Sequence, residues 1–224
     1  MKITNANLIR LAGLSALLGG LCYVFVGIFH PANSPASVTT TTWGTVHVVV
    51  SAMSFFGVLG LVGIYARQAV KVGWIGLVGF ILLSAWFVLI MGFSFVEAFI
   101  LPQIATATPA FVDGWMKMFN GGTSSISMGA LPTLWTLSAP LYMLGGLLFG
   151  IATFRARILP RGAAVLLAVG TVLAPVASKL SLSAMPKIAI PTGLALAWLG
   201  YALMTERRTA AAATAAKSEL RRAA

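Results

Sequence analysis

Long apolar runs alternate with polar connectors along the chain, and six of the runs are long enough to cross a lipid bilayer. A helix needs about 20 apolar residues to cross the hydrocarbon core, which is roughly 30 Å thick. The runs lack the alternation of apolar and polar residues found in membrane-barrel strands, so we expect helices. The predicted spans cover about residues 8–29, 45–66, 73–101, 132–154, 161–178 and 188–204. The pattern predicts an all-α, six-transmembrane-helix bundle over residues 1–204, followed by a basic, alanine-rich cytoplasmic tail over 205–224.

The composition favours lipid over water as the surroundings of this bundle. Hydrophobic residues make up 59% of the 224 residues and charged residues only 8%, and the mean hydropathy is +0.96. A domain of this size cannot hide so much apolar surface from water. We therefore predict a multi-pass protein of the inner (cytoplasmic) membrane, with the lipid bilayer as its main partner.

The basic residues fall mainly on one side of the predicted bundle. Three of the fifteen, Lys117, Lys179 and Lys187, lie in connectors on one side. The other twelve are Lys2, Arg10, Arg67, Lys71, Arg155, Arg157, Arg161, Arg207, Arg208, Lys217, Arg221 and Arg222. Because Lys and Arg mark cytoplasmic connectors, both termini are predicted to be cytoplasmic. The net charge of +11 is then mainly a topology signal, and without a folded basic face we expect no nucleic-acid partner.

The connector after the third span contains an amphipathic segment. Thr108 and Pro109 are typical of a helix N-cap followed by proline at the first helical position. Asp113 and Lys117 share one face as an i, i+4 pair. The apolar residues at helical spacing are Phe111, Trp115, Met118 and Phe119. We expect a short helix on the outer membrane surface, with Trp115 as its interfacial anchor.

Small residues and prolines predict how the spans pack. Lipid offers no hydrophobic force that brings helices together, so association depends on close packing, which glycine permits. Pro140 and Pro175, inside the fourth and fifth spans, predict kinked or loosened helices. Two similar glycine strings flank the connector between the second and third spans, with members Gly57, Gly60, Gly63, Gly73, Gly76 and Gly79.

Three ionisable residues stand at the ends of the first three spans. His30 ends the first span, His47 begins the second, and Glu97 lies near the end of the third. With the N-terminus inside, all three of these ends face the outer surface. Helices consecutive in sequence are usually neighbours in space. We therefore expect the two imidazoles and the carboxyl group to converge at similar depth.

The neighbours of these three residues indicate which helix faces turn inward. Residues three, four or seven positions apart lie on one helix face. Small and hydroxylic companions on such faces favour an orientation into the bundle. The companions are Tyr23 and Gly27 for His30, Ser51 and Ser54 for His47, and Ser94 for Glu97.

Several chemistries fit such a cluster. His30, His47 and Glu97 form the ligand set of an open zinc site, with a fourth position for water or substrate. The two histidines also suit the axial positions of a haem, and nearby methionines make copper a further alternative. Without a metal, Glu97 and a histidine form an acid–base pair or proton relay. The methionines are Met53, Met91, Met116, Met118 and Met128.

Two other functional classes remain open at this point. The polar residues are also compatible with helix ends in a non-catalytic accessory or scaffold subunit, bound to another membrane protein or to further copies of the chain. A small-solute transporter is a third alternative. It is less favoured because the predicted midplane holds no charge and no clearly broken helix pair.

The chain also resembles a group of known proteins. The first helix closes on His30-Pro31, the second opens with His47, and the third ends in Phe-Val-Glu97-Ala-Phe-Ile-Leu-Pro102. The run from Phe149 to Arg161, FGIATFRARILPR, adds to this pattern. Together these features resemble small, uncharacterised multi-pass bacterial membrane proteins. The resemblance implies a multi-pass membrane fold and no particular activity.

Overall fold

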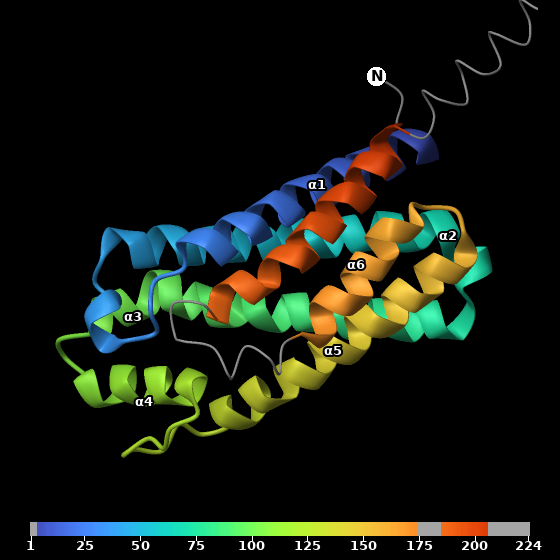
Figure 1. The fold of residues 1–224 in the computed structure, drawn as a ribbon. Helices are drawn as coiled ribbons and strands as arrows, with labels where there is room; N and C mark the ends of the chain where they lie inside the picture. Colours follow the sequence, from blue (N-terminus) through green and yellow to red (C-terminus); the bar gives the residue numbers. More distant parts are fainter. Residues whose placement is uncertain (1–3, 174–184, 206–224) are drawn as a thin grey trace, which may run out of the picture.

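The chain forms a helical bundle (Figure 1). A computed structural model describes residues 4–173 and 185–205, and every regular element in these ranges is helical. The predicted all-α class is confirmed. The elements are α1 (Asn5–Phe29), a 3₁₀ turn (Pro35–Ser37), α2 (Thr41–Phe95), a π-helical turn (Val96–Ile100), α3 (Leu101–Ile104), α4 (Pro109–Asn120), α5 (Leu131–Ala156), α6 (Arg161–Val172) and a C-terminal helix (Pro186–Thr205).

Helix α2 is a hairpin of two helices joined at Gly73. The backbone at Gly73 has φ 56° and ψ −159°, which is not helical. Glycine adopts a positive φ without the steric penalty of a Cβ. The second half returns beside the first (Figure 1), so the reversal separates the second and third predicted spans.

Four continuous helical stretches in the described ranges are long and apolar enough to cross a membrane, judged by length and composition. They are Asn5–Phe29, Thr41–Ile104 with its internal reversal, Leu131–Ala156 and Pro186–Thr205. Helix α6 is shorter, with 12 residues. The remainder of the fifth predicted span, Pro175 and the basic tail lie outside the described residues. Pro140 does not end α5, which continues through it.

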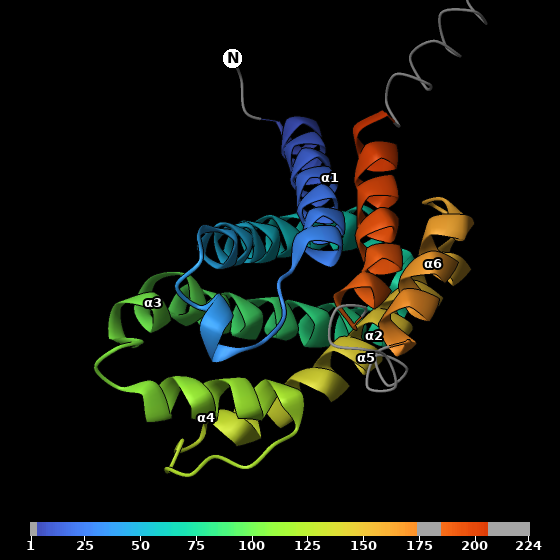
Figure 2. The ribbon, with the colours of Figure 1, turned by 60° about the vertical axis from the view of Figure 1, so that its left-hand side comes forward.

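Glycines mark the contacts between neighbouring helices. At several of them an added Cβ would lie within 3 Å of the next helix. These contacts connect α1, the two halves of α2, α5, α6 and the C-terminal helix, which returns to pack on α1 (Figure 2). Examples are Gly20 against Gly193, Gly60 against Ala16, Gly57 against Phe87, Gly145 against Leu83, Gly150 against Ala164 and Gly170 against Thr192. The expected close approach of helices at glycines is confirmed.

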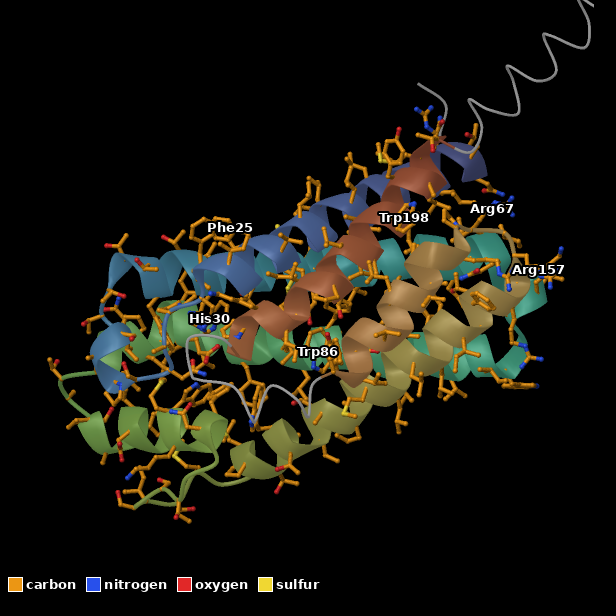
Figure 3. The ribbon with its side chains drawn as sticks, in the orientation of Figure 1. Phe25, His30, Arg67, Trp86, Arg157 and Trp198 are labelled. Carbon is orange, nitrogen blue, oxygen red and sulfur yellow. The ribbon has the colours of Figure 1, made fainter. Side chains whose placement is uncertain are left out.

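The two ends of the bundle differ in character. Arg67, before the reversal of α2, and Arg157, which follows α5, lie at one end, whereas His30 lies at the opposite end (Figure 3). Helix α4 packs beside the end that holds His30 (Figure 2). Any site formed by the histidines is therefore far from the arginine-rich turns.

Candidate functional site

A cavity of about 260 Å³ lies at the histidine end of the bundle. A cavity of about 150 Å³ lined by apolar side chains is enough to bind benzene, so this one has room for a ring with a small substituent. The side chains that line it come from α1, both halves of α2, α4, α5 and the start of the C-terminal helix. They include Tyr23, His30, His47, Met53, Trp86, Phe93, Glu97, Phe119, Trp135 and Ala189.

The start of α2 sets the position of His47. The hydroxyl of Thr40 accepts a hydrogen bond from the backbone N–H of Trp43 (3.3 Å), which caps the first turn. One turn later, His47 is almost completely buried, with 1% of its surface exposed. Its Nδ1 lies 2.8 Å from the backbone carbonyl of Trp43. Because a carbonyl oxygen only accepts, Nδ1 carries the hydrogen, and Nε2 of the neutral ring is an acceptor.

Glu97 reaches His47 from the other half of α2. It lies in the π-helical turn Val96–Ile100, where the regular helical ladder is interrupted, a feature often found at functional sites. Its Oε2 is 3.3 Å from Nε2 of His47. The indole of Trp115 on α4 donates to Oε1 (3.2 Å), and the indole of Trp43 donates to the Glu97 backbone carbonyl (2.8 Å). These three contacts, two to the carboxyl group and one to the backbone, hold Glu97 in place, and only 5% of its surface is exposed.

The contact between His47 and Glu97 requires a shared proton. Nε2 of a neutral imidazole and the oxygen of a carboxylate are both acceptors, and two facing acceptors repel each other. A single proton between them gives either a carboxylic acid bonded to imidazole or a carboxylate bonded to imidazolium. Both forms have no net charge, which suits a buried position in a membrane protein. We call these two residues the His–Glu pair.

His30 completes the polar side of the cavity. It follows the last residue of α1, and its Nδ1 donates to the Pro31 carbonyl oxygen (2.7 Å). Its ring packs edge-on against the ring of His47, with 5.1 Å between centroids. Burial lowers the pKa of the His30 imidazole from its ordinary value, so this ring is neutral at pH 7. The structure therefore brings together all three of the residues predicted to converge.

Two serines that were predicted to lie beside the site connect the two halves of α2. The hydroxyls of Ser51 and Ser94 are 2.9 Å apart, one turn away from His47 and near Glu97 in the chain. Tyr23 lines the same cavity as His30, as their shared helix face predicts. Ser54 is fully buried, but its hydroxyl has no hydrogen-bond partner among the described residues, and Ser54 does not line the cavity.

The geometry gives no support to a zinc, haem or copper site. Over residues 4–173 and 185–205, no three His, Cys, Asp or Glu side chains are grouped so that they could hold a metal ion. The rings of His30 and His47 contact each other, so no macrocycle fits between them as an axial pair requires. Of the predicted methionines, Met53 lines the cavity, whereas Met116 and Met128 pack in an apolar cluster around Trp115.

The prediction for α4 is confirmed in part and wrong in part. The helix begins at Pro109, and Asp113 and Lys117 form the expected ion pair at 2.8 Å. Trp115, however, is not an interfacial anchor. It is 1% exposed, packs against Phe93 and donates to Glu97. The apolar face of α4 covers the protein rather than lipid.

Sequence reasoning also missed the tryptophans that surround the site. The ring of Trp43 lies tilted against that of His47 with 4.1 Å between ring centroids, and Trp86 and Trp135 line the cavity. The position of Trp43 four residues before His47 places both on one helix face. That spacing is the one signal by which the sequence could have identified Trp43.

Fold and site together define an all-helical protein whose long apolar helices are typical of a membrane protein, with a buried His–Glu pair beside a cavity at one end. No protein-family model matches the chain, and it has no significant match among curated proteins or solved structures.

Proposed function

We propose that the protein is a six-span inner-membrane protein that binds a small, largely apolar molecule in its cavity. Beside the bound molecule, the His–Glu pair gives up or takes up a proton. The observation that carries this proposal is the 3.3 Å contact between His47 and Glu97 inside a cavity-lining cluster. A buried acid and base in contact, with one face toward a cavity, is the arrangement expected of a proton-transfer site.

The proposed orientation rests on the two ends of the bundle. Arg67 and Arg157 lie at the end opposite His30, in connectors whose basic residues favour the cytoplasmic side. The cavity is then at the outer face, and both termini are cytoplasmic.

Cysteine labelling tests this orientation. In a Cys22→Ala background, Ser125→Cys lies in the connector before α5 and Lys71→Cys lies beside the reversal of α2; both positions are exposed. We expect a membrane-impermeant maleimide to label Ser125→Cys in intact cells and Lys71→Cys only after the membrane is permeabilised. The reverse pattern would contradict the orientation.

Three probes that share a benzene ring test the cavity: benzyl alcohol, phenylacetate and benzyltrimethylammonium. We expect at least one to bind the detergent-purified protein saturably in isothermal titration calorimetry. Ala189→Phe, which fills the cavity, should abolish that binding, whereas Ala66→Phe, at an exposed position of α2, should leave it unchanged. This comparison separates cavity binding from partition into detergent.

An accessory or scaffold role makes a different prediction for the same titration. If none of the three probes binds, or if Ala189→Phe leaves binding unchanged, the proposed function is rejected. The non-catalytic role would then explain the polar residues better.

A further inference from the structure

The cavity has an unusual balance of charges. Among the described residues that line it there is no Lys or Arg, and Glu97 is the one acidic residue. An organic anion would therefore find no charged partner among these residues. A cation would find a carboxyl group, provided that the carboxyl group gives up its proton.

The rings around the cavity add a second preference for a cation. Trp135 lies 5.7 Å from Phe93 and 4.2 Å from Phe119, measured between ring centroids. Tyr23 stacks on Trp86 at 6.0 Å on another part of the lining. Aromatic faces carry negative potential and attract ammonium groups, most strongly where water is excluded.

Within residues 4–173 and 185–205, the other titratable groups near the His–Glu pair do not supply a competing charge. These groups include His30 just after α1, which is neutral because burial lowers its pKa, and Tyr23 on α1, a neutral phenol that lines the cavity. Tyr142 on α5 hydrogen-bonds Thr192 (2.7 Å). The charged residues on α4 and at the start of the C-terminal helix are Asp113 and Lys117, which pair with each other, and Lys187, which is exposed.

We propose that the cavity binds an organic ammonium ion of about single-ring size in exchange for the proton shared by His47 and Glu97. This inference rests on the proposed function and names its ligand class. In the resting site, the His–Glu pair holds one proton and has no net charge. When the ammonium ion enters, the proton passes to water, which leaves a carboxylate on Glu97 and a neutral imidazole on His47. These two acceptors then share no proton, and the positive charge of the ligand offsets the repulsion between them. No covalent bond of the ligand forms or breaks.

Electrostatics makes the exchange one for one. With either the proton or the ammonium ion, the site carries no net charge. With both bound, the site would hold one uncompensated positive charge. With neither bound, it would hold one uncompensated negative charge. Either charge is costly within a membrane protein. One proton leaves for each ligand bound. The apparent affinity should therefore rise about tenfold per pH unit over the pH range in which the free His–Glu pair holds its proton.

Benzyltrimethylammonium tests the exchange, because its permanent charge ensures that every proton counted comes from the protein. Calorimetric titration of the purified protein in buffers of different ionisation enthalpy gives the number of protons released. We expect one proton per ligand and tighter binding than for benzyl alcohol. Glu97→Gln should weaken binding at least tenfold and remove its pH dependence, whereas Asp113→Asn, outside the cavity, should change neither.

Two results would overturn the inference. One is cation binding without proton release or without a loss in Glu97→Gln, with thermal unfolding used to confirm that this variant is folded. The other is binding of benzyl alcohol or phenylacetate, sensitive to Ala189→Phe, without binding of the cation. In that second case the proposed function would stand and only the ligand class would fail; if no probe binds, both fail.

Discussion

Replacing Glu97 with alanine should lower the free energy of unfolding by about 2–6 kcal/mol, because two buried polar groups each lose a partner at about 1–3 kcal/mol apiece. These groups are Nε2 of His47 and the indole N–H of Trp115. The loss should appear as a lower midpoint of thermal or chemical unfolding in detergent.

Glutamine at the same position is the matched control. Its amide oxygen can accept from Trp115, and its amide N–H₂ can donate to Nε2 of His47, so both buried partners remain satisfied. Glu97→Gln should therefore unfold within about 1 kcal/mol of the wild-type protein, a difference typical of a retained hydrogen bond. Equal destabilisation by alanine and glutamine, or no loss with alanine, would show that these contacts are not formed.

We expect Gly20→Leu, at the crossing of α1 and the C-terminal helix, to cause the second large loss of stability. An added Cβ at Gly20 would lie 2.5 Å from the carbonyl oxygen of Gly193 and 2.9 Å from Cα of Ala197. Both are backbone atoms, so the helices themselves must separate. We expect a loss of about 3 kcal/mol or more, at or above the upper end of typical overpacking costs.

Gly92→Ala provides the comparison for Gly20→Leu. Gly92 is exposed on α2, and an added Cβ there would meet nothing within 4 Å. Removing the conformational freedom of a mid-helix glycine should stabilise the protein by about 0.5–1 kcal/mol. Unfolding midpoints of both variants in the same detergent test the packing, and a Gly20→Leu protein as stable as Gly92→Ala would contradict the close crossing.

Much of the fold follows from patterns that are local in the sequence. Long apolar runs predict helices because backbone groups in lipid must bond within their own segment, and α1 and α5 match two of these runs closely. The convergence of His30, His47 and Glu97 also follows, since all three stand at corresponding ends of consecutive helices.

The details of the site depend on distances that helix ends do not determine. Similar depth does not determine whether two imidazoles and a carboxyl group surround a metal or bond to each other. In the structure, Nε2 of His47 faces Glu97 directly, so the acid–base alternative fits better than the metal alternatives.

The spacing of apolar residues in the sequence could not predict that Trp115 is buried. Spacing along α4 identifies an apolar face but does not reveal whether lipid or protein covers it. The deciding contacts, with Phe93 and Glu97, come from a different helix, 18 or more residues earlier in the chain.

The central claim is that His47 and Glu97 share one proton, and nitrogen-15 NMR of the histidine side chains tests it most directly. The chain has two histidines, so a histidine-labelled sample gives two imidazoles, which His30→Asn assigns. We predict that His47 has its hydrogen on Nδ1 and that its Nε2 resonance shows a strong hydrogen bond that Glu97→Ala removes. A His47 ring with its hydrogen on Nε2 alone, or a spectrum that Glu97→Ala leaves unchanged, would contradict the account.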